Sequence, residues 1–120
     1  AFLKNKRPVI YGRGQQTRDF TYIDNIIEAN LKALKSKFNN GEIFNIACGS
    51  ETSLLDLINA LNKIFSKNIK PYFEKEREGD IKYSFADISK AKKELNYKPK
   101  ISFEEGLKKT IDWFANYGKN

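Results

Sequence analysis

The sequence predicts a small mixed α/β fold, an α+β lobe in which short strands alternate with about four helices. Three observations support this class. Short runs of β-branched and aromatic residues alternate with longer stretches of helical periodicity. Only three of these runs are convincing strands, which is too few for a complete doubly wound sheet. The 120 residues are also enough for one modest hydrophobic core. We therefore expect residues 1–120 to form one domain that is part of a larger protein.

The first predicted elements are two strands and a helix. Residues 7–12 (RPVIYG) form a short strand that a glycine turn ends, and residues 17–23 (TRDFTYI) alternate like a second strand. Asp24 can cap the following helix, and the glycine of residues 39–41 (NNG) can end it. The apolar stripe that this helix should bury comprises Ile23, Ile27, Leu31, Leu34 and Phe38.

The middle of the chain predicts a buried strand, a helix and an edge strand. Residues 42–47 (EIFNIA) form the compact apolar run that is typical of a buried strand. Ser53 and Asp56 have the spacing of a capping box, with Asp in place of Glu, and the clearest amphipathic pattern of the chain follows them. Its apolar residues are Leu54, Leu57, Ile58, Leu61, Ile64 and Phe65. Residues 70–75 (KPYFEK) then predict an edge strand.

Two helices are predicted in the last part of the chain. A short helix extends from about residue 88 to residue 95, capped by Asp87 or Ser89. Ser102 and Glu105 have the spacing of a second capping box, which opens the final helix. The side chains expected to face inward on that helix are Leu107, Ile111, Trp113 and Phe114.

Composition argues against several classes of site. The chain has no His and a single Cys, Cys48, which argues against a transition-metal centre and against His-based acid–base catalysis. A lone cysteine cannot form an internal disulfide, and this is typical of a cytoplasmic protein. No apolar run is long enough to span a membrane, and no signal peptide opens the sequence. The net charge of +7 comes mostly from lysines scattered over predicted helices, so we expect neither a membrane nor a nucleic-acid partner.

Arg18 can be interpreted in two ways from its neighbours alone. It begins a predicted strand after a glycine-containing turn, so it could form a surface ion pair with Asp19 or present its guanidinium to an anion. The glycines at 12 and 14 lie between two strands rather than between a strand and a helix, so they do not match a dinucleotide-binding turn. None of the six tyrosines is followed by a lysine four residues later.

Three stretches of the chain carry a family pattern. They are residues 7–29 (RPVIYGRGQQTRDFTYIDNIIEA), 44–58 (FNIACGSETSLLDLI) and 76–114 (EREGDIKYSFADISKAKKELNYKPKISFEEGLKKTIDWF). In order and spacing they resemble the C-terminal part of NAD-dependent nucleotide-sugar epimerases and dehydratases, the extended short-chain dehydrogenase/reductase family that includes UDP-glucose 4-epimerase. The resemblance covers nearly the whole chain. Its most specific part is R-E-G-D followed by A-D-x-S-K-A and L-x-Y-x-P.

The resemblance implies a set of substrate-binding residues. In this family two arginines meet the diphosphate of a nucleoside-diphosphate sugar, and the matching positions here are Arg18 and Arg77. A guanidinium suits a diphosphate because it donates two parallel, charge-assisted hydrogen bonds. Asp80 is in position to accept a hydrogen bond from a ribose hydroxyl, and Gly79 lets the backbone pass close to the nucleotide. Gln16 can face the sugar or the diphosphate, or it can simply be a polar turn residue.

The resemblance also implies what this chain lacks. Family members bind NAD in an N-terminal Rossmann domain with G-x-x-G-x-x-G and carry a catalytic Y-x-x-x-K, and neither motif is present here. We therefore expect a substrate lobe whose NAD-binding half and catalytic residues lie elsewhere, inactive by itself and without NAD. The chain departs from the family pattern at Arg13, which we expect to face water, and at Ala47 and Cys48 of the usual N-I-G-x-G.

The family reaction that fits best is UDP-hexose 4-epimerisation. The resemblance implies that the missing tyrosine deprotonates the C4 hydroxyl while hydride passes to NAD, and that the transient ketone turns before hydride returns. The same lobe would serve a 4,6-dehydratase, a decarboxylase or a reductase, because the residues that choose the chemistry are absent. A stand-alone basic binding module is a further alternative, and it predicts no Y-x-x-x-K upstream. An apolar face that once met the missing domain would also allow a homodimer.

Overall fold

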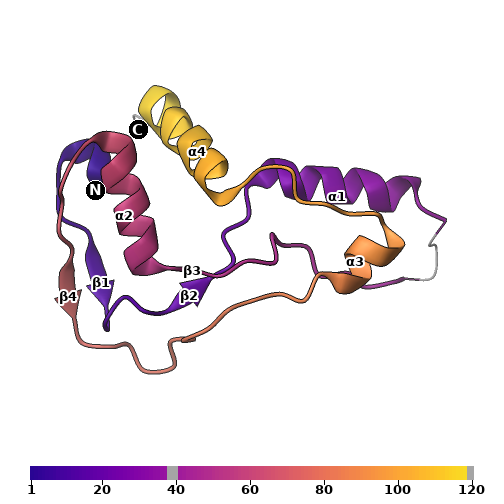
Figure 1. Ribbon diagram of the computed structural model, residues 1–120, viewed down its shortest axis with the longest axis horizontal. Helices are drawn as coiled ribbons and strands as arrows, with labels where there is room; N and C mark the ends of the chain where they lie inside the picture. The colour runs from indigo at the N-terminus through magenta and orange to yellow at the C-terminus, as the bar shows by residue number, and fades with distance from the viewer. Residues whose placement is uncertain (38–40, 119–120) are drawn as a thin grey trace.

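The computed structural model describes residues 1–37 and 41–118 and confirms the predicted fold class (Figure 1). Its elements in chain order are the 3-10 turn η1 (Phe2–Lys4), β1 (Val9–Tyr11), β2 (Thr17–Arg18), α1 (Ile23–Lys35), β3 (Thr52–Ser53), α2 (Leu54–Phe65), β4 (Tyr72–Glu74), α3 (Ser89–Glu94) and α4 (Phe103–Tyr117). Within the described ranges, no helix has both the length and the apolar character that a membrane crossing requires.

The strands form two separate two-stranded sheets. β1 pairs with β4 in parallel, with Tyr11 opposite Glu74, and this confirms the strands predicted at 7–12 and 70–75. β2 pairs with β3 in the antiparallel direction. β2 is shorter than the run predicted at 17–23, because the backbone beyond its second residue turns into α1 instead of continuing along a neighbouring strand.

The predicted cap of α2 is present and that of α4 is half present. The Asp56 N–H donates to Ser53 Oγ at 3.0 Å, and the Ser53 N–H donates to the Asp56 carboxylate at 3.2 Å. This is the complete capping box that the spacing predicts. In α4 the Glu105 N–H donates to Ser102 Oγ at 3.2 Å, which is one of the two bonds of such a box.

The predicted caps of α1 and α3 are wrong. The N-cap of α1 is Tyr22, and Asp24 lies inside the first turn. Tyr22 packs closely against Gly106 of α4, because a Cβ added at Gly106 would lie only 2.7 Å from the Cβ of Tyr22. This contact with α4 fixes Tyr22 at the start of α1. The N-cap of α3 is Ile88, which has no capping side chain. The Asp87 carboxylate accepts from the Ser89 N–H at 2.9 Å just before the helix, and hydrogen bonding to the side chain and backbone of Ser89 lowers the pKa of Asp87.

Residues 42–47 do not form the buried strand that their composition predicts. Their backbone takes part in no strand of the described structure, and Ile43 is 81% exposed although Ala47 is buried. A strand needs a neighbouring strand to accept and donate its backbone hydrogen bonds. Because none lies beside this run in the described part of the chain, the β-forming composition alone does not produce a strand.

The apolar stripe predicted on α1 is not buried. Asn25 and Ala29 are the buried residues of this helix, whereas Leu34 is 82% exposed and Ile23, Ile27 and Leu31 are about half exposed or more. The helix ends at Lys35 with Ser36 as C-cap, before the stop predicted at 39–41. Phe38 and residues 39–40 lie outside the described residues. The helix itself is predicted correctly, but the burial of its apolar stripe is not, because no other described element covers that face of α1.

The final helix is also less buried than predicted. Trp113 and Phe114 are both more than half exposed, so the interior position expected for them is wrong. Leu107 and Ile111 are half-buried, and Gly106 is the one buried residue of α4. The helix therefore contacts the rest of the chain mainly around Gly106 and presents an apolar face beyond it.

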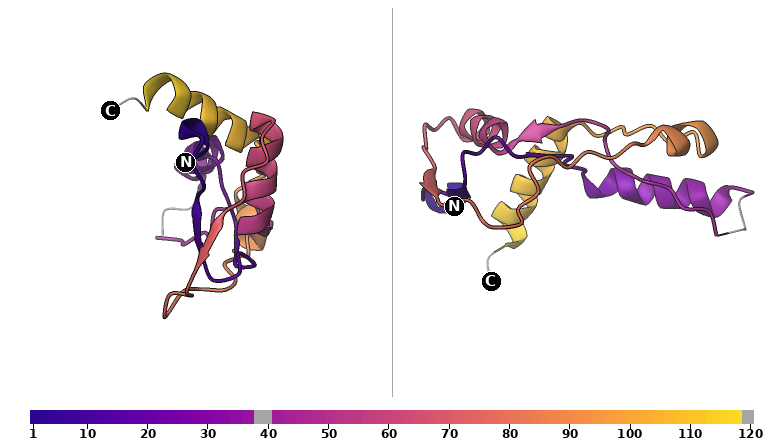
Figure 2. Two further views of the ribbon diagram at one scale, coloured as in Figure 1. Left: turned by 90° about the vertical axis from the view of Figure 1, so that its left-hand side faces the viewer. Right: turned by 90° about the horizontal axis from the view of Figure 1, so that it is seen from below.

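Two hydrophobic clusters take the place of the single core that the length predicts. One includes Ala29, Ala91, Leu95 and Tyr97 from α1, α3 and the segment after α3. The other consists of Phe2, Ile10 and Ile58, which connect η1, β1 and α2. Figure 2 shows α1 and α3 together at one end of the molecule and β1, β4 and α2 at the other. The radius of gyration of 16.9 Å exceeds the value of about 14 Å for a compact domain of this length.

Asn25 joins α1 to the segment that precedes α4. It is 1% exposed, and its Nδ2 donates to the Ile101 carbonyl at 2.8 Å. Its Oδ1 accepts from the backbone N–H groups of Lys100 at 2.9 Å and Ile101 at 3.0 Å. One amide side chain therefore satisfies three backbone groups of a segment that has no regular hydrogen bonds of its own.

Tyr97 is the largest fully buried side chain, and its ionisation should be delayed. Its hydroxyl donates to the Ala47 carbonyl at 2.9 Å, and burial raises the pKa of Tyr97 from 10 to about 12. The stability that the neutral phenol contributes is complete below pH 10 and is lost as the pH rises toward 12. Phenolate absorbance should therefore show one tyrosine titrating last, and Tyr97→Phe should remove that step and cost about 1 kcal/mol. An unchanged titration curve in Tyr97→Phe would contradict this assignment.

Candidate functional site

A polar hollow lies at the edge of the sheet where β1 and β4 end. Because the two strands run in parallel, their carboxyl ends are at the same edge, and the Gly12 N–H continues the pairing by donating to the Glu74 carbonyl at 2.9 Å. The segments that follow the two strands line a cavity of about 390 Å³. Open α/β sheets bind their ligands at this kind of edge, outside the carboxyl ends of parallel strands.

The lining combines aromatic rings, side-chain amides and charges of both signs. It consists of Tyr11, Gly12, Arg13, Gln15, Gln16, Glu76, Asp80, Lys82 and Tyr83. Two of the residues predicted to bind substrate, Gln16 and Asp80, are therefore in the wall. Arg13 is exposed, as expected, but it also lines this cavity.

The turn between β1 and β2 is fixed by its glycines and by Gln16. Gly12 and Gly14 have φ of +78° and +75°, which is the left-handed region that glycine adopts without strain. A Cβ added at Gly14 would also lie 3.0 Å from the Leu55 side chain, so the close packing of α2 requires glycine there. Gln16 Nε2 donates to the Tyr11 carbonyl across the turn at 2.7 Å. Gln16 therefore stabilises the turn as a polar turn residue, and it also lines the cavity.

Arg18 lies behind the cavity wall and holds Asp80 in it. Its Nη2 is 2.9 Å from Asp80 Oδ1, and its Nη1 donates at 2.7 Å to the carbonyls of Thr17 and Ile81. The side chains of Arg18 and Asp80 are 31% and 29% exposed. The segment around Asp80 is also held to β2 by its backbone, since the Thr17 N–H donates to the Lys82 carbonyl at 2.8 Å. Of the two interpretations of Arg18, the ion pair with Asp19 is not formed, and Arg18 pairs with Asp80 instead.

Asp19 has a structural role of its own. Its carboxylate accepts from the backbone N–H groups of Cys48 at 3.0 Å and Gly49 at 2.8 Å. These bonds hold the 48–49 turn beside β2. The departure at Ala47 and Cys48 is compatible with this packing, because Ala47 is buried and Cys48 is half-buried.

Arg77 is not among the residues that line the cavity, but it lies on the face of Tyr11, which does. The carbon of its guanidinium is 3.6 Å from the centroid of the Tyr11 ring, a cation–π contact, and the residue is exposed. Gly79 sits in the turn that joins Arg77 to Asp80, with the Asp80 N–H donating to the Arg77 carbonyl at 3.2 Å. Its φ of +78° requires glycine, whereas a Cβ there would meet no atom within 4 Å. The conformation of the turn is therefore a sufficient reason for this glycine.

The charges around the cavity leave two cations without a carboxylate. Asp80 is paired with Arg18, and the Glu76 carboxylate lies 3.9 Å from Lys82 Nζ. Neither Arg13 nor Arg77 forms an ion pair with any residue that the structure describes. The two positive and two negative side chains of the wall balance, and Arg77 adds a positive charge beside Tyr11. An anion placed there would meet two guanidinium groups, those of Arg13 and Arg77, that form no ion pair with a described carboxylate.

Sequence reasoning missed several members of this site. The pattern around Tyr11 predicts only a strand residue, yet its ring stacks with Arg77 and lines the cavity. Tyr83, Lys82 and Glu76 lie in the polar stretch that includes the R-E-G-D motif, so their closeness to it was the available signal. The pairing of β1 with β4, which brings the two halves together, could not be inferred from either segment alone.

The described residues provide neither a metal centre nor a dinucleotide turn. Across residues 1–37 and 41–118, no three His, Cys, Asp or Glu side chains gather closely enough to hold a metal ion. The glycine turn after β1 leads into β2 and not into a helix. It therefore lacks the helix N-terminus on which a dinucleotide's pyrophosphate rests. NAD does not fit this turn.

Comparison with known proteins identifies the family. A family model described as GDP-mannose 4,6 dehydratase matches residues 1–110. The chain belongs to this family. A relative in the family, the UDP-glucuronate 4-epimerase of Thermodesulfobacterium geofontis, is 40% identical over 114 residues, which cover 93% of this chain and 35% of that protein.

Two solved structures of epimerases have the same fold. The UDP-glucose 4-epimerase of Thermotoga maritima, crystallised with UDP-glucose, superposes with a TM-score of 0.89 at 36% identity, covering 98% of this chain and 38% of that one. The UDP-glucuronic acid 4-epimerase of Bacillus cereus, in complex with UDP-glucuronic acid and NAD, gives 0.88 at 42% identity, covering 95% and 37%. This chain therefore spans little more than a third of the length of these relatives. The resemblance to the C-terminal part of NAD-dependent nucleotide-sugar epimerases and dehydratases is confirmed.

Proposed function

We propose that residues 1–120 form the nucleoside-diphosphate-sugar-binding domain of an NAD-dependent UDP-hexose 4-epimerase. The observation that carries this proposal is the cavity at the carboxyl edge of β1 and β4, with Arg13 and Arg77 unpaired around it. A diphosphate is a compact dianion, and free guanidinium groups are the side chains that bind it best. The epimerase relatives and their UDP-sugar complexes support the choice of a UDP-sugar.

The proposed binding mode gives each residue a separate task. Arg77 moves from the Tyr11 face, or tilts on it, to donate to the diphosphate. Arg18 stabilises the diphosphate from behind and keeps Asp80 Oδ1 engaged, so that Oδ2 accepts from a ribose hydroxyl. Gln16 borders the diphosphate. Gly79, which has no side chain, lets the backbone of the Arg77–Asp80 turn lie close to the nucleotide. Held at the diphosphate, the hexose keeps the freedom to turn.

The rest of the enzyme is proposed to complete the site. We place NAD and the catalytic residues in a Rossmann domain outside these 120 residues, covering the exposed apolar face of α1. The apolar stripe of α1 and the shortness of the chain relative to its relatives support this partner. We propose a cytoplasmic enzyme, since Cys48 is a free thiol and the sequence contains no second cysteine. A homodimer would then form between intact polypeptides.

The intact polypeptide should convert UDP-glucose to its C4 epimer. The assay supplies UDP-glucose, UDP-N-acetylglucosamine, dTDP-glucose or UDP-glucuronic acid and identifies the products by chromatography and NMR. An epimerase returns the hydride to the same sugar, so the product should keep the mass of the substrate. Loss of water would indicate a 4,6-dehydratase, loss of carbon dioxide from a uronic acid substrate a decarboxylase, and net consumption of reduced cofactor a reductase. Each of these results would overturn the epimerase assignment while leaving the binding domain in place.

A further inference from the structure

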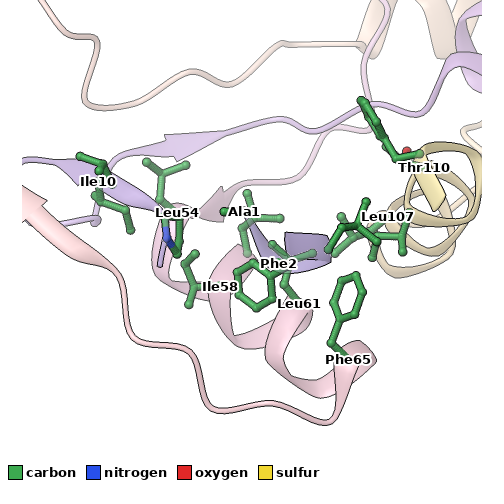
Figure 3. A pocket seen from close by; sticks show the side chains of 15 residues that line it. Ala1, Phe2, Ile10, Leu54, Ile58, Leu61, Phe65, Leu107 and Thr110 are labelled. Carbon is green, nitrogen blue, oxygen red and sulfur yellow. The ribbon is translucent and has the colours of Figure 1, made fainter. Parts of the chain in front are cut away.

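Two cavities of the chain differ sharply in what they can recognise. The groove between α2 and α4 has a volume of about 450 Å³, and every side chain that lines it is apolar except that of Thr110 (Figure 3). The Thr110 hydroxyl already donates to the Gly106 carbonyl at 2.8 Å. The cavity at the carboxyl edge of β1 and β4 is lined instead by charged side chains, amides and tyrosines. One of its lining residues, Arg13, has no task in the binding mode proposed above.

The backbone on both sides of Arg13 is held in place. The Gly12 N–H donates to the Glu74 carbonyl at 2.9 Å, which ties one end of the turn to β4. The Leu55 N–H donates to the Gly14 carbonyl at 3.1 Å, which ties the other end to α2. Arg13 therefore enters the cavity wall from a fixed backbone, and a ligand has to order only its side chain.

The guanidinium of Arg13 has no partner among the residues that the structure describes. It forms no ion pair, no hydrogen bond and no ring contact with any of them. The other nitrogen groups of the wall are more engaged, since Gln16 Nε2 donates to the Tyr11 carbonyl and Lys82 Nζ lies 3.9 Å from the Glu76 carboxylate. Arg13 thus brings a full set of N–H donors to the cavity.

The proposed function determines which part of a UDP-sugar lies beside Arg13. Asp80, in the cavity wall, is assigned to the ribose, and Arg77, which stacks on Tyr11 outside the lining, is assigned to the diphosphate. The base is attached on the opposite side of the ribose from the diphosphate. It therefore extends away from Arg77 and into the cavity, whose volume of about 390 Å³ lies within the range of ~300–1,000 Å³ of ligand pockets.

We propose that Arg13 selects uracil by donating a hydrogen bond to O4 of the base. The inference rests on the proposed function, because the position of the base follows from the roles given to Asp80 and Arg77. Uracil, like thymine, has an accepting carbonyl at position 4, whereas cytosine has a donating amino group there. A guanidinium contains donors only. It forms a charge-assisted hydrogen bond with uracil and opposes the amino group of cytosine.

The other polar side chains of the wall cannot make this distinction. Gln15 also lines the cavity and has no partner in the described part of the chain. Its amide donates through nitrogen and accepts through oxygen, so it suits either pyrimidine by turning over. The hydroxyl of Tyr83 likewise donates and accepts. Discrimination requires a side chain that only donates, and Lys82, the other such residue of the wall, is engaged with Glu76.

The ratio of the affinities for UDP and CDP tests the contact, because the two ligands share the ribose and the diphosphate. Isothermal titration calorimetry of the intact polypeptide measures both affinities. We expect the wild type to prefer UDP by about 10-fold or more and Arg13→Ala to lose most of this preference. The general effect of the lost positive charge on the diphosphate is the same for both ligands and cancels in the ratio. Arg13 is exposed and makes no contact with the described residues, so Arg13→Ala should fold like the wild type.

Gln15→Ala is the matched control, because Gln15 lies in the same turn and lines the same cavity. It should keep the preference for UDP, and that result together with the loss in Arg13→Ala would support the proposal. An equal affinity of the wild type for UDP and CDP, or an unchanged ratio in Arg13→Ala, would overturn it. If UDP still binds and still depends on Arg77 in that case, the proposed function stands and only the role of Arg13 fails.

GDP is the third ligand, because an arginine can bind O6 and N7 of guanine together. A preference of the wild type for GDP that Arg13→Ala removes would overturn the selection of uracil and the choice of a UDP-sugar as substrate. Failure of UDP, CDP and GDP alike to bind the intact polypeptide would overturn both this inference and the proposed function.

Discussion

Replacing Asn25 by alanine should lower the free energy of unfolding by about 3 kcal/mol, although the side chain removed is small. The substitution leaves the Ile101 carbonyl and the N–H groups of Lys100 and Ile101 without their partner. These groups are partly buried between α1 and the segment before α4, where water cannot replace all three bonds. The loss should appear in denaturant titrations as a lower midpoint with an unchanged slope.

The matched control is Asn30→Ala on the same helix. Asn30 is exposed, so its replacement should change the free energy of unfolding by no more than about 0.5 kcal/mol. Asn25→Asp separates the two halves of the amide: its carboxylate can still accept from the two N–H groups, but it donates to the Ile101 carbonyl only when protonated. Its deficit should therefore shrink as the pH falls. Equal midpoints for Asn25→Ala and Asn30→Ala would show that the segment before α4 is held by other contacts.

Replacing Arg77 by alanine should weaken UDP binding by about 10- to 100-fold, which corresponds to roughly 1.4–2.8 kcal/mol, without loss of stability. The guanidinium of Arg77 is exposed and stacks on Tyr11, so the fold does not depend on it. Its proposed partner is the diphosphate, and charge-assisted bonds of this kind are worth about 1.5–3 kcal/mol each. Isothermal titration calorimetry of the intact polypeptide with UDP measures the effect directly.

Arg7 provides the control for this experiment because its guanidinium is similarly stacked. It lies 3.4 Å from the centroid of the Tyr72 ring and donates to the carbonyls of Lys70 and Pro71, away from the cavity. Arg7→Ala should reduce stability and leave the affinity for UDP unchanged. Arg18→Ala should reduce both, because Arg18 also holds Asp80 and the Ile81 carbonyl. If Arg77→Ala and Arg18→Ala both bind UDP like the wild type, the diphosphate assignment is wrong.

The features that sequence reasoning predicted well are local ones. The capping box of Ser53 and Asp56 depends on residues three apart, and the strand at residues 9–11 depends on a short β-forming run before a glycine turn. Neither needs knowledge of distant contacts. The same reasoning placed the cap of α1 two residues late, at Asp24, because the contact of Tyr22 with Gly106 of α4 is not visible in the local sequence.

Burial was harder to predict because it depends on which segment covers which face. The stripe of α1 and the run at residues 42–47 have the composition of buried elements, yet Leu34 and Ile43 are exposed in this chain. Periodicity identifies the apolar side of an element but not its partner. Buried residues that the pattern did not indicate include Tyr97 and Asn25, and Asn25 is a polar residue that counts as a surface position on any hydrophobicity pattern.

Predicting the candidate site requires both the local sequence pattern and the contacts between distant segments. Gln16, Arg18, Arg77, Gly79 and Asp80 came from the family pattern. Of these, Gln16 and Asp80 line the cavity, Arg18 is bonded to Asp80, and Arg77 stacks on Tyr11 of the lining. Their individual contacts, such as Arg18 on Asp80 and Arg77 on Tyr11, could not be derived from spacing. Those contacts depend on the parallel pairing of two strands that are distant in the sequence. Their part in binding remains a proposal.

That parallel pairing also imposes an order of events during synthesis. The ribosome releases β1 long before β4, and no hairpin can bring the two strands together in the meantime. Until Tyr72–Glu74 emerges, the backbone groups that β1 will pair with β4 are open to strands of other nascent chains. Correct assembly of the cavity therefore requires that β1 does not pair with another chain between its own release from the ribosome and that of β4.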